Sequence, residues 1–480
     1  MTKNIEAIRV NLNDMKYRYD IFLMINLYFS FTNIEFVEDE YDIAIEINDK
    51  SIDITGIYND FHYTINENYK LSEEVKKAVF NYLKKGTGKV LPWGTLVGIR
   101  PSKKALSYLE SGYNEEKIIK EFQDRHETLE EKTKLCIEVA KYEKNLVNTD
   151  KNSISIYVGM PFCPTRCVYC SFTSNPIGAN KNNVTNYLNS LTKEIEEISK
   201  YVDEKKLRIE TVYFGGGTPT SVNDDQFEDI MVKIYNNFVK DRDVKEFTVE
   251  CGRVDSITRN KLLSMRRYNV DRISINPQTM NDDTLKAIGR NHNSKAVEEC
   301  FNMARELGFD NINMDLIVGL PGENLNHIVN SCERIAKLNP DNLTIHGLSV
   351  KRGSRLHENL INNKAYVVPD QDELNSMYET TKLLSEKLNM KPYYMYRQKN
   401  MVGNMENVGY CRDEKVCIYN IQMIEEKQTI IALGADGVSK VVFLNENRIE
   451  RFANVKDVKE YNNRIDEMIE KKIQLLNTLY

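Results

Sequence analysis

The sequence has no long hydrophobic run and no excess of positive charge. Its most apolar early stretch, IFLMINLYF, is too short to span a bilayer and contains Asn26. The first residues, MTKNIEAIRVNLND, lack the apolar core and cleavage site of a signal peptide. The net charge of −6 and the pI near 5.8 argue against a nucleic-acid partner, which would need a basic face. These absences predict a cytoplasmic protein, expected to be a monomer, without a membrane or nucleic-acid partner.

Histidine is also scarce, and the cysteines form no disulfide pattern. The six histidines show no metal-binding spacing. The nine cysteines are odd in number and spread along the chain, which excludes a disulfide framework. Cys411 and Cys417 have no further partners nearby and are interpreted as ordinary thiols. The remaining anomaly is a group of three, Cys163, Cys167 and Cys170, in the segment YVGMPFCPTRCVYCSF.

The 480 residues are long enough for several domains, and four ranges are predicted. Residues 1–90 alternate strand-like and helical runs and predict an N-terminal α/β domain. Residues 91–150 predict a helical connector, which is entered through the glycine- and proline-rich stretch GTGKVLPWGTLVGIRPSK (86–103). The GTGK at 86–89 lacks phosphate-loop spacing. Residues 151–350 form the core, and residues 351–480 a mixed C-terminal extension on the substrate side.

The core range alternates short β-branched runs with longer amphipathic ones. Strands are predicted at 153–160, 211–217, 246–251, 272–277, 311–318 and 342–348, with helices between them, for example 184–201 and 294–307. Six β-α units in succession predict a parallel sheet, open or curled into a barrel. In such sheets the active site lies at the carboxyl ends of the strands.

The three cysteines follow the spacing C-x3-C-x2-C directly after the first strand of this series. A structural zinc site would need a fourth ligand, and a ferredoxin loop would supply a fourth nearby cysteine and a proline. Neither pattern fits, and three unligated thiols at this density and place are improbable. Three thiolates on a 4Fe–4S cube leave one iron open, which is what a cluster needs to bind a small molecule.

This spacing after a first barrel strand resembles the radical S-adenosylmethionine (SAM) enzymes. The resemblance implies a partial (β/α)6 TIM-like barrel, a 4Fe–4S cluster on Cys163, Cys167 and Cys170, and SAM on the open iron, cleaved to a 5′-deoxyadenosyl radical. It also implies a low-potential electron donor, which the sequence does not identify.

YVGMPFC, GGGTPT, DRISINPQTMND, AIGRNHN and INMDLIVGLPGE are similar in order to the oxygen-independent coproporphyrinogen III oxidase family. LPWGTLVGIRPSK, VKRGSRL and YRQKNMVGNMENVGY resemble its HemZ-type coproporphyrinogen dehydrogenase branch. The similarity implies a porphyrinogen substrate and haem biosynthesis. It places the SAM contacts on Tyr157, Tyr169, Gly216, Gly217, Thr218, Glu250, Gln278, Arg290 and Asp315.

Two positions depart from the oxidases: Gly159 stands where they have histidine, and Phe172 where they have a fourth cysteine. The haem chaperones of the family also end the loop in C-x-F. Three functions therefore stay open, namely coproporphyrinogen III decarboxylation, haem carriage and another radical reaction on a tetrapyrrole. A tetra-anionic substrate favours arginine and lysine contacts, which are expected from Arg352, Arg397 and Lys399; no residue is predicted to act as the catalyst itself.

Overall fold

The structure is a computed structural model that describes residues 7–29, 32–98, 100–172, 174–179, 181–351, 353–361, 369–398 and 401–480. The chain divides into two compact units. The first comprises residues 1–140, 370–376 and 396–406, and the second residues 141–369, 377–395 and 407–480. The four domain ranges expected from the sequence stay a prediction.

The first unit is an α/β fold with one five-stranded sheet. Its strands, in the order β2-β1-β3-β4-β5, are β1 (Ala7–Leu12), β2 (Asn33–Phe36), β3 (Ile43–Ile47), β4 (Ser51–Gly56) and β5 (Phe61–Thr64). Strand β1 runs parallel to both of its neighbours, and the other pairs are antiparallel. The helices that follow are α1 (Arg18–Tyr28), α2 (Leu71–Thr87), α3 (Pro101–Glu110), α4 (Glu115–His126) and α5 (Glu130–Glu143).

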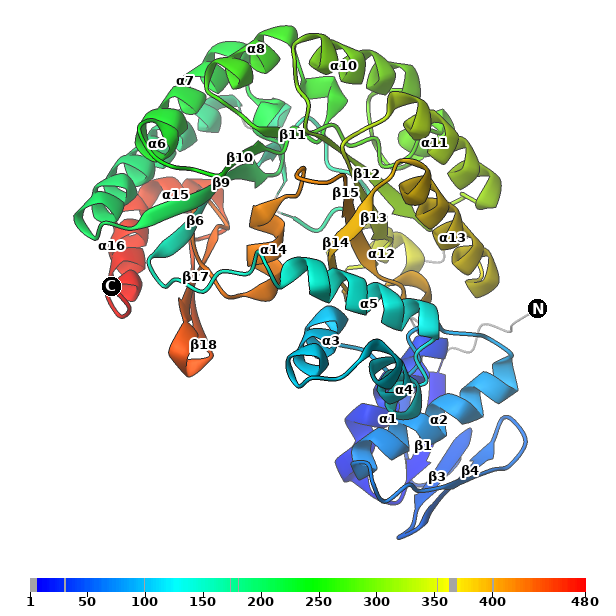
Figure 1. Ribbon diagram of the computed structural model, residues 1–480. Coiled ribbons are helices and arrows are strands. Elements are labelled where there is room, and N and C mark those ends of the chain that lie inside the picture. Colours follow the sequence, from blue (N-terminus) through cyan, green and yellow to red (C-terminus); the bar gives the residue numbers. More distant parts are fainter. Residues whose placement is uncertain are drawn as a thin grey trace. The chain divides into compact units, whose positions relative to one another are not determined.

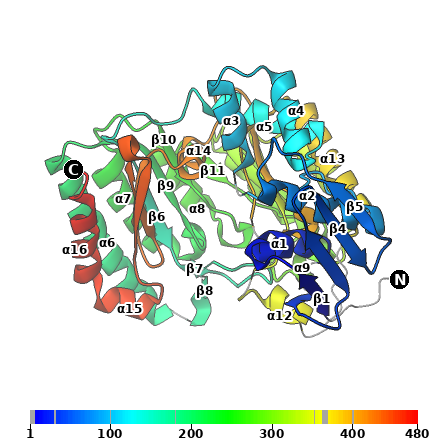
Figure 2. The same cartoon turned by 90° about the horizontal axis from the view of Figure 1, so that it is seen from below.

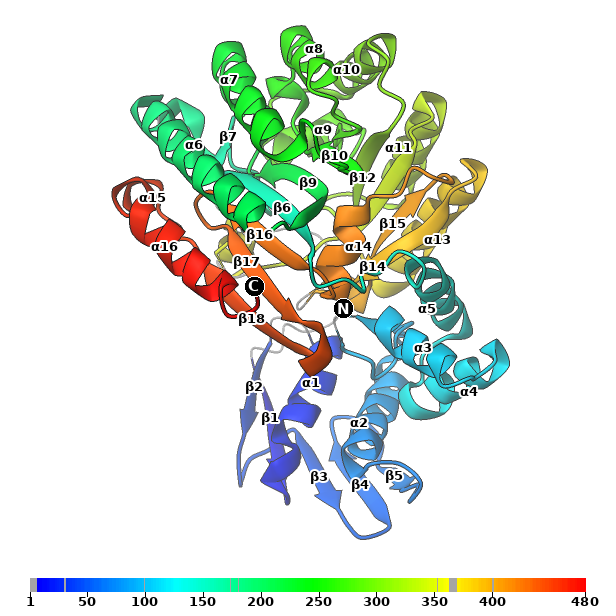
Figure 3. The same ribbon diagram turned by 60° about the vertical axis from the view of Figure 1, so that its left-hand side comes forward.

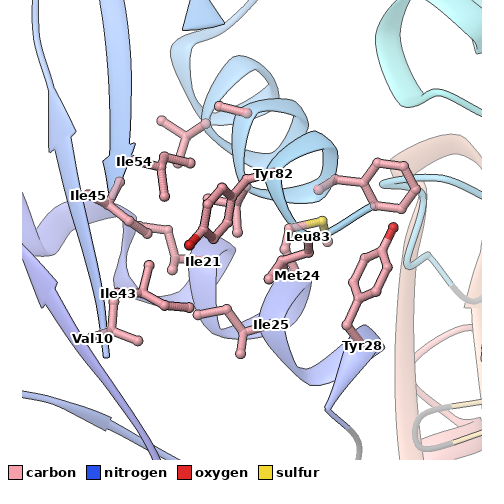
Figure 4. Packing of buried hydrophobic residues seen from close by; sticks show 14 of the residues in the cluster. Val10, Ile21, Met24, Ile25, Tyr28, Ile43, Ile45, Ile54, Tyr82 and Leu83 are labelled. Atoms are coloured by element: carbon pink, nitrogen blue, oxygen red, sulfur yellow. The ribbon is translucent and has the colours of Figure 1, made fainter. Parts of the chain in front are cut away.

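The core of this unit lies between its sheet and α1 and α2. Alternate residues of the strands point inward, as Ile43 and Ile45 do in β3, because successive strand side chains face opposite sides. From the helices, Ile21, Ile25 and Leu83 meet them at helical spacing. Figure 4 shows these side chains packed together from both layers.

The second unit is built on an eleven-stranded sheet in the order β14-β15-β13-β12-β11-β10-β9-β6-β16-β17-β18. Its central strands β6 (Ser153–Met160), β9 (Arg208–Gly216), β10 (Glu246–Val249), β11 (Arg272–Ser274), β12 (Ile312–Val318) and β13 (Asn342–Gly347) are parallel. They consist almost wholly of buried residues, as expected for strands covered on both faces.

Helices connect the parallel strands and lie along the outer side of the curved sheet (Figure 1). They are α6 (Lys181–Glu204), α7 (Asp224–Ile234), α8 (Arg259–Arg267), α9 (Asp282–Ala287), α10 (Ser294–Glu306) and α11 (Leu325–Leu338). The α/β class predicted from the sequence is confirmed. Among the described strands no pairing joins β14 to β18, so the sheet is open there.

Late parts of the chain complete this sheet at both ends. On one side, β16 (Thr429–Leu433) pairs parallel with β6, and β17 (Val438–Phe443) and β18 (Arg448–Ala453) follow antiparallel. On the other, β15 (Asn407–Cys411) pairs antiparallel with β13, and β14 (Lys391–Tyr396) lies beyond it. Figure 3 shows β16 beside β6. The first strand of the core is therefore an inner strand of the sheet.

The remaining helices are α12 (Arg355–Ile361), α13 (Gln371–Lys387), α14 (Ile418–Glu425), α15 (Val458–Asn463) and α16 (Ile465–Leu476). Figure 2 shows α15 and α16 alongside α6, which they contact. Among the described residues, no helix has both the length and the hydropathy needed to span a bilayer.

A buried ionic cluster links these late helices to the sheet. The Glu194 carboxylate accepts hydrogen bonds from Lys472 Nζ, from Tyr461 OH at 2.6 Å, from Asn454 Nδ2 at 2.9 Å and from the Gly434 N–H at 2.7 Å. The Glu194 and Lys472 side chains are fully buried. The cluster joins α6, α15 and α16 to the turn that follows β16.

Candidate functional site

The three clustered cysteines lie on one loop at the carboxyl end of β6. The loop follows the short strand β7 (Phe162–Cys163), and the Cys170 N–H closes a turn by donating to the Cys167 carbonyl at 3.1 Å. Cys163 and Cys167 are buried, and Cys170 is half-buried. Burial raises the pKa of the Cys163 thiol to about 11 and also raises the pKa of Cys170. These two bare thiols are therefore neutral, and becoming thiolates requires a positive partner such as a metal.

The glycine turn after β9 packs directly against this loop. Gly216 has φ +106°, and a Cβ there would lie 2.8 Å from the Met160 nitrogen. A Cβ on Gly217 would lie 2.6 Å from the Phe162 carbonyl oxygen and 3.0 Å from Cys163 Sγ. Both positions therefore exclude a side chain. The glycines thus allow the turn to approach the end of β6 and the first cysteine of the loop closely.

Two of the cysteine sulfurs receive a hydrogen bond from outside the loop. Thr218 Oγ1 donates to Cys163 Sγ at 3.4 Å, and Arg253 Nη1 donates to Cys167 Sγ at 3.4 Å. Donors of this kind stabilise sulfur when it carries negative charge, as a cluster ligand does. The loop is thus surrounded by groups suited to thiolates.

Arg253 is itself held by several contacts. Its Nε and Nη2 donate to the two oxygens of Asp255 at 2.9 and 2.7 Å, and its Nη1 and Nη2 donate to the carbonyl and the hydroxyl of Thr165 at 3.2 and 3.0 Å. His292 Nδ1 lies 3.8 Å from the same Asp255 carboxylate. This network was not predicted from the sequence. The signal was present, because CGRVD directly follows a strand at its carboxyl end.

Tyr169, which lies on the loop between Cys167 and Cys170, contacts Arg290. Arg290 Nη1 donates to the Asn276 carbonyl at 2.6 Å, and Nη2 lies 3.4 Å from the Tyr169 hydroxyl. Burial raises the pKa of Tyr169, so the hydroxyl is neutral. Among the described groups here, Asn276 Oδ1 and the Nε atoms of Arg290 and Arg166 are buried without a hydrogen-bond partner. Such buried polar atoms fit a site that takes a polar ligand.

Glu250 and Asp315 form an acidic pair in which the two carboxyls differ. Burial and the Asp315 charge raise the pKa of Glu250, whose Oε2 accepts from Tyr213 OH at 2.9 Å. Burial opposes ionisation of Asp315 too, but His346 Nε2 at 3.5 Å and Asn313 Nδ2 at 2.7 Å hold the pKa of Asp315 below its ordinary value. The pKa values of the two carboxyls therefore shift in opposite directions, and Asp315 is the one whose ionised form is favoured. His346 was missed because its spacing to Asp315 arises only from the pairing of β12 and β13.

Gln278 is held beside Asp315 by the backbone. Its N–H donates to the Asp315 carbonyl at 2.9 Å, and its own carbonyl accepts from the Ile317 N–H at 2.9 Å. Gln278 has φ +66°, which is uncommon for a residue other than glycine. Strained backbone of this kind persists where the surrounding structure enforces it, often at functional sites.

Tyr157 is part of a tyrosine stack inside the unit. Its ring lies 6.2 Å from both the Tyr213 and the Tyr419 rings, which are themselves 4.4 Å apart and nearly parallel at 21°. The Tyr213 member also donates to Glu250, so the stack adjoins the acidic pair. Tyr419 was not predicted, since it comes from α14 and no local pattern links it to the core strands.

Of the predicted substrate contacts, Arg397 is the one that lies among the described residues. Arg397 is buried in the first unit, where its guanidinium donates to the carbonyls of Leu96, Asn404 and Met405. It also lies over the Trp93 ring at 5.0 Å. These contacts hold the guanidinium in place, and its contact with a propionate stays a prediction. Arg352 and Lys399 lie outside the described residues.

Within the described part of the chain, no three His, Cys, Asp or Glu side chains are gathered closely enough to hold a single metal ion. A cubane cluster makes a different demand, because it spreads its cysteine ligands over separate irons. Three cysteines on one loop, two of them with sulfur-directed donors, fit that demand.

Comparison with known proteins supports the same reading of the loop. Residues 157–335 match the family model of the Radical SAM superfamily. The chain is 38% identical to the oxygen-independent coproporphyrinogen-III oxidase-like protein HemZ of Bacillus subtilis, over 86% of this chain and 82% of that protein. It is 32% identical to the haem chaperone HemW of the same organism, over 54% of this chain and 68% of the chaperone.

Among solved structures, coproporphyrinogen III oxidase (HemN) from Escherichia coli matches with a TM-score of 0.52 at 20% identity, covering 68% of this chain and 72% of that one. At this identity the match speaks for the fold alone. It confirms the radical SAM α/β fold expected for the core.

Proposed function

Because this chain belongs to the oxygen-independent coproporphyrinogen III oxidase-like family of radical SAM proteins, we propose that it decarboxylates coproporphyrinogen III oxidatively to protoporphyrinogen IX. The observation that carries the proposal is the cysteine loop with its sulfur-directed donors, in a chain similar to HemZ over 82% of that protein's length. In this reaction two propionate groups of the substrate become vinyl groups.

Membership of the superfamily implies a 4Fe–4S cluster and SAM. Cys163, Cys167 and Cys170 would hold the cluster, and the Thr218 hydroxyl and the Arg253 guanidinium would stabilise the charge on two of their sulfurs. A cluster held there would supply the electron for cleavage of SAM into methionine and a 5′-deoxyadenosyl radical.

The proposed SAM contacts are the residues around the loop and the acidic pair. Asp315, whose pKa is held below its ordinary value by His346 and Asn313, suits an ammonium group or ribose hydroxyls. The buried Arg290, whose Nε has no partner among the described residues, suits a carboxylate. The full proposed set is Tyr157, Tyr169, Gly216, Gly217, Thr218, Glu250, Gln278, Arg290 and Asp315.

A second candidate function is haem carriage without turnover. The observation that favours it is the 32% identity to HemW. Phe172, which stands where the oxidases carry a fourth cysteine, is 65% exposed beside the loop. The Lys351 ammonium lies over this ring at 5.1 Å. An exposed aromatic ring with a cation beside it suits a flat, anionic tetrapyrrole as well as a porphyrinogen.

One anaerobic experiment separates the two. Reconstituted protein is incubated with coproporphyrinogen III, SAM and dithionite, and the products are analysed by mass. We expect loss of two carbon dioxide units and four hydrogen atoms per porphyrinogen, together with release of two deoxyadenosines. Cys167→Ala should abolish both, whereas Cys411→Ala, which alters a buried thiol near Tyr142 OH, should leave both intact. Tight haem binding without any vinyl product in the parent would replace the proposal by the carrier function.

A further inference from the structure

Arg253 brings a full positive charge into contact with one of the three cysteine sulfurs. Its residue is 3% exposed, and its Nη1 lies 3.4 Å from Cys167 Sγ. The Cys163 sulfur, by contrast, receives only a neutral hydroxyl, from Thr218. In a buried setting a charge is screened little by solvent and salt. Arg253 is thus the cation that donates directly to a cysteine sulfur, while Arg166 and Lys351 act on Cys170 through their charge.

The orientation of this cation is fixed by the chain. Asp255 accepts from two guanidinium nitrogens at once, and Thr165 accepts from two through its carbonyl and hydroxyl oxygens. A bidentate fork of this kind defines the guanidinium plane, which a lysine could not reproduce. The N–H that points at Cys167 is therefore set in place by protein groups alone.

Resting on the proposed function, we propose that Arg253 sets the reduction potential of the cluster and makes it easier to reduce. Reduction adds one negative charge to the cluster, so a neighbouring cation stabilises the reduced form more than the oxidised form. Hydrogen bonds to the sulfurs and local net charge are established determinants of cluster potentials. Asp255 then acts as a positioning residue that partly offsets the same charge.

The test is a redox titration, monitored by electron paramagnetic resonance, of the anaerobically reconstituted full-length protein. In Arg253→Gln the ratio of reduced to oxidised cluster at the parent's midpoint should fall about tenfold, the scale of one charge-assisted hydrogen bond. The matched control is Arg267→Gln in α8, which removes an exposed arginine paired with Glu228 at 2.5 Å. It should leave the midpoint unchanged.

Asp255→Asn supplies an independent arm with the opposite sign. Asparagine still accepts a hydrogen bond from Arg253 but carries no charge, so the midpoint should move to a more positive potential. If Arg253→Gln loses its iron, this variant decides the question.

Iron and sulfide contents are measured for every protein. A parent that takes up no cluster would overturn the proposed function and this inference with it. If both variants hold a full cluster and keep the parent's midpoint, only the role assigned to Arg253 is overturned. The same holds if Arg253→Gln is empty and Asp255→Asn keeps the parent's midpoint.

Discussion

Asp315 and Glu250 are both proposed SAM contacts, and replacing either of them has a measurable consequence. Replacing either with alanine should weaken SAM binding about 10- to 100-fold, because a hydrogen bond to a charged group is worth about 1.5–3 kcal/mol. The cluster should be spared, since neither side chain bonds to a cysteine. Isothermal titration of the reconstituted protein with SAM measures the loss.

Asp310→Ala is the control for this prediction. Asp310 lies just before β12, the strand that contains Asp315. Its side chain is exposed and pairs with Lys415 at 3.0 Å. SAM affinity should be unaffected there. Equal affinity in all three variants and the parent would show that the acidic pair is not the SAM site.

Gly217 offers a test of the contact between the glycine turn and the cysteine loop. Gly217→Ala should lower cluster content several-fold, because its Cβ would lie 3.0 Å from Cys163 Sγ and 2.6 Å from a backbone oxygen, and overpacking costs about 1–3 kcal/mol. Gly178→Ala, at a site where a Cβ meets nothing within 4 Å, is the matched control. Iron and sulfide assays check both; normal cluster content in Gly217→Ala would contradict the packing argument.

Single residues differ in how far the sequence could predict them. The cysteine spacing is local, so its position at the mouth of the sheet followed from one strand and one loop. Arg397 shows the opposite case. Its neighbours Leu96 and Trp93 are some 300 positions away in the sequence, as the separation of 301 residues between Arg397 and Leu96 shows. The sequence does not show that the Arg397 guanidinium donates hydrogen bonds to backbone carbonyls in the folded protein.

At the level of elements, the ion pair between α6 and α16 is the clearest source of stability to test. Lys472→Ala should lower the free energy of unfolding by about 3–5 kcal/mol, because the Glu194 carboxylate would lose its buried counter-charge. Lys471→Ala removes the adjacent, exposed lysine, which pairs with Glu467 at 2.7 Å, and should cost at most about 0.5 kcal/mol. Denaturant unfolding measures both. Equal stability of the two variants would contradict the assigned role of the pair.

The core strands could be predicted because their pattern is local. The runs expected at 153–160, 311–318 and 342–348 correspond to β6, β12 and β13 within one residue at each end. The partners of β16 could not be foreseen in the same way. TIIAL signals a buried strand, but nothing within it names β6 as its neighbour, since strand pairing is decided by the packing of the whole sheet.

For the whole molecule, the pairing of β16 with β6 predicts that the core does not fold stably without residues 426–480. A protein truncated after residue 425 would lose β16, exposing an edge of β6, and would leave Glu194 buried without Lys472. We expect it to aggregate or to melt without cooperativity, as seen by circular dichroism and light scattering. The full-length protein is the reference. A truncated chain that melts cooperatively and still takes up iron would contradict this dependence.

The same pairing governs when the site can be completed during biosynthesis. Gln428 donates to Ser153 across 275 residues of chain. At about 5–20 residues per second, a ribosome needs on the order of 15–60 s to make the intervening segment. Throughout that interval β16 is not yet available to pair with β6, the strand that leads into the cysteine loop. We therefore expect the proposed cluster to be delivered only after β16 has paired with β6.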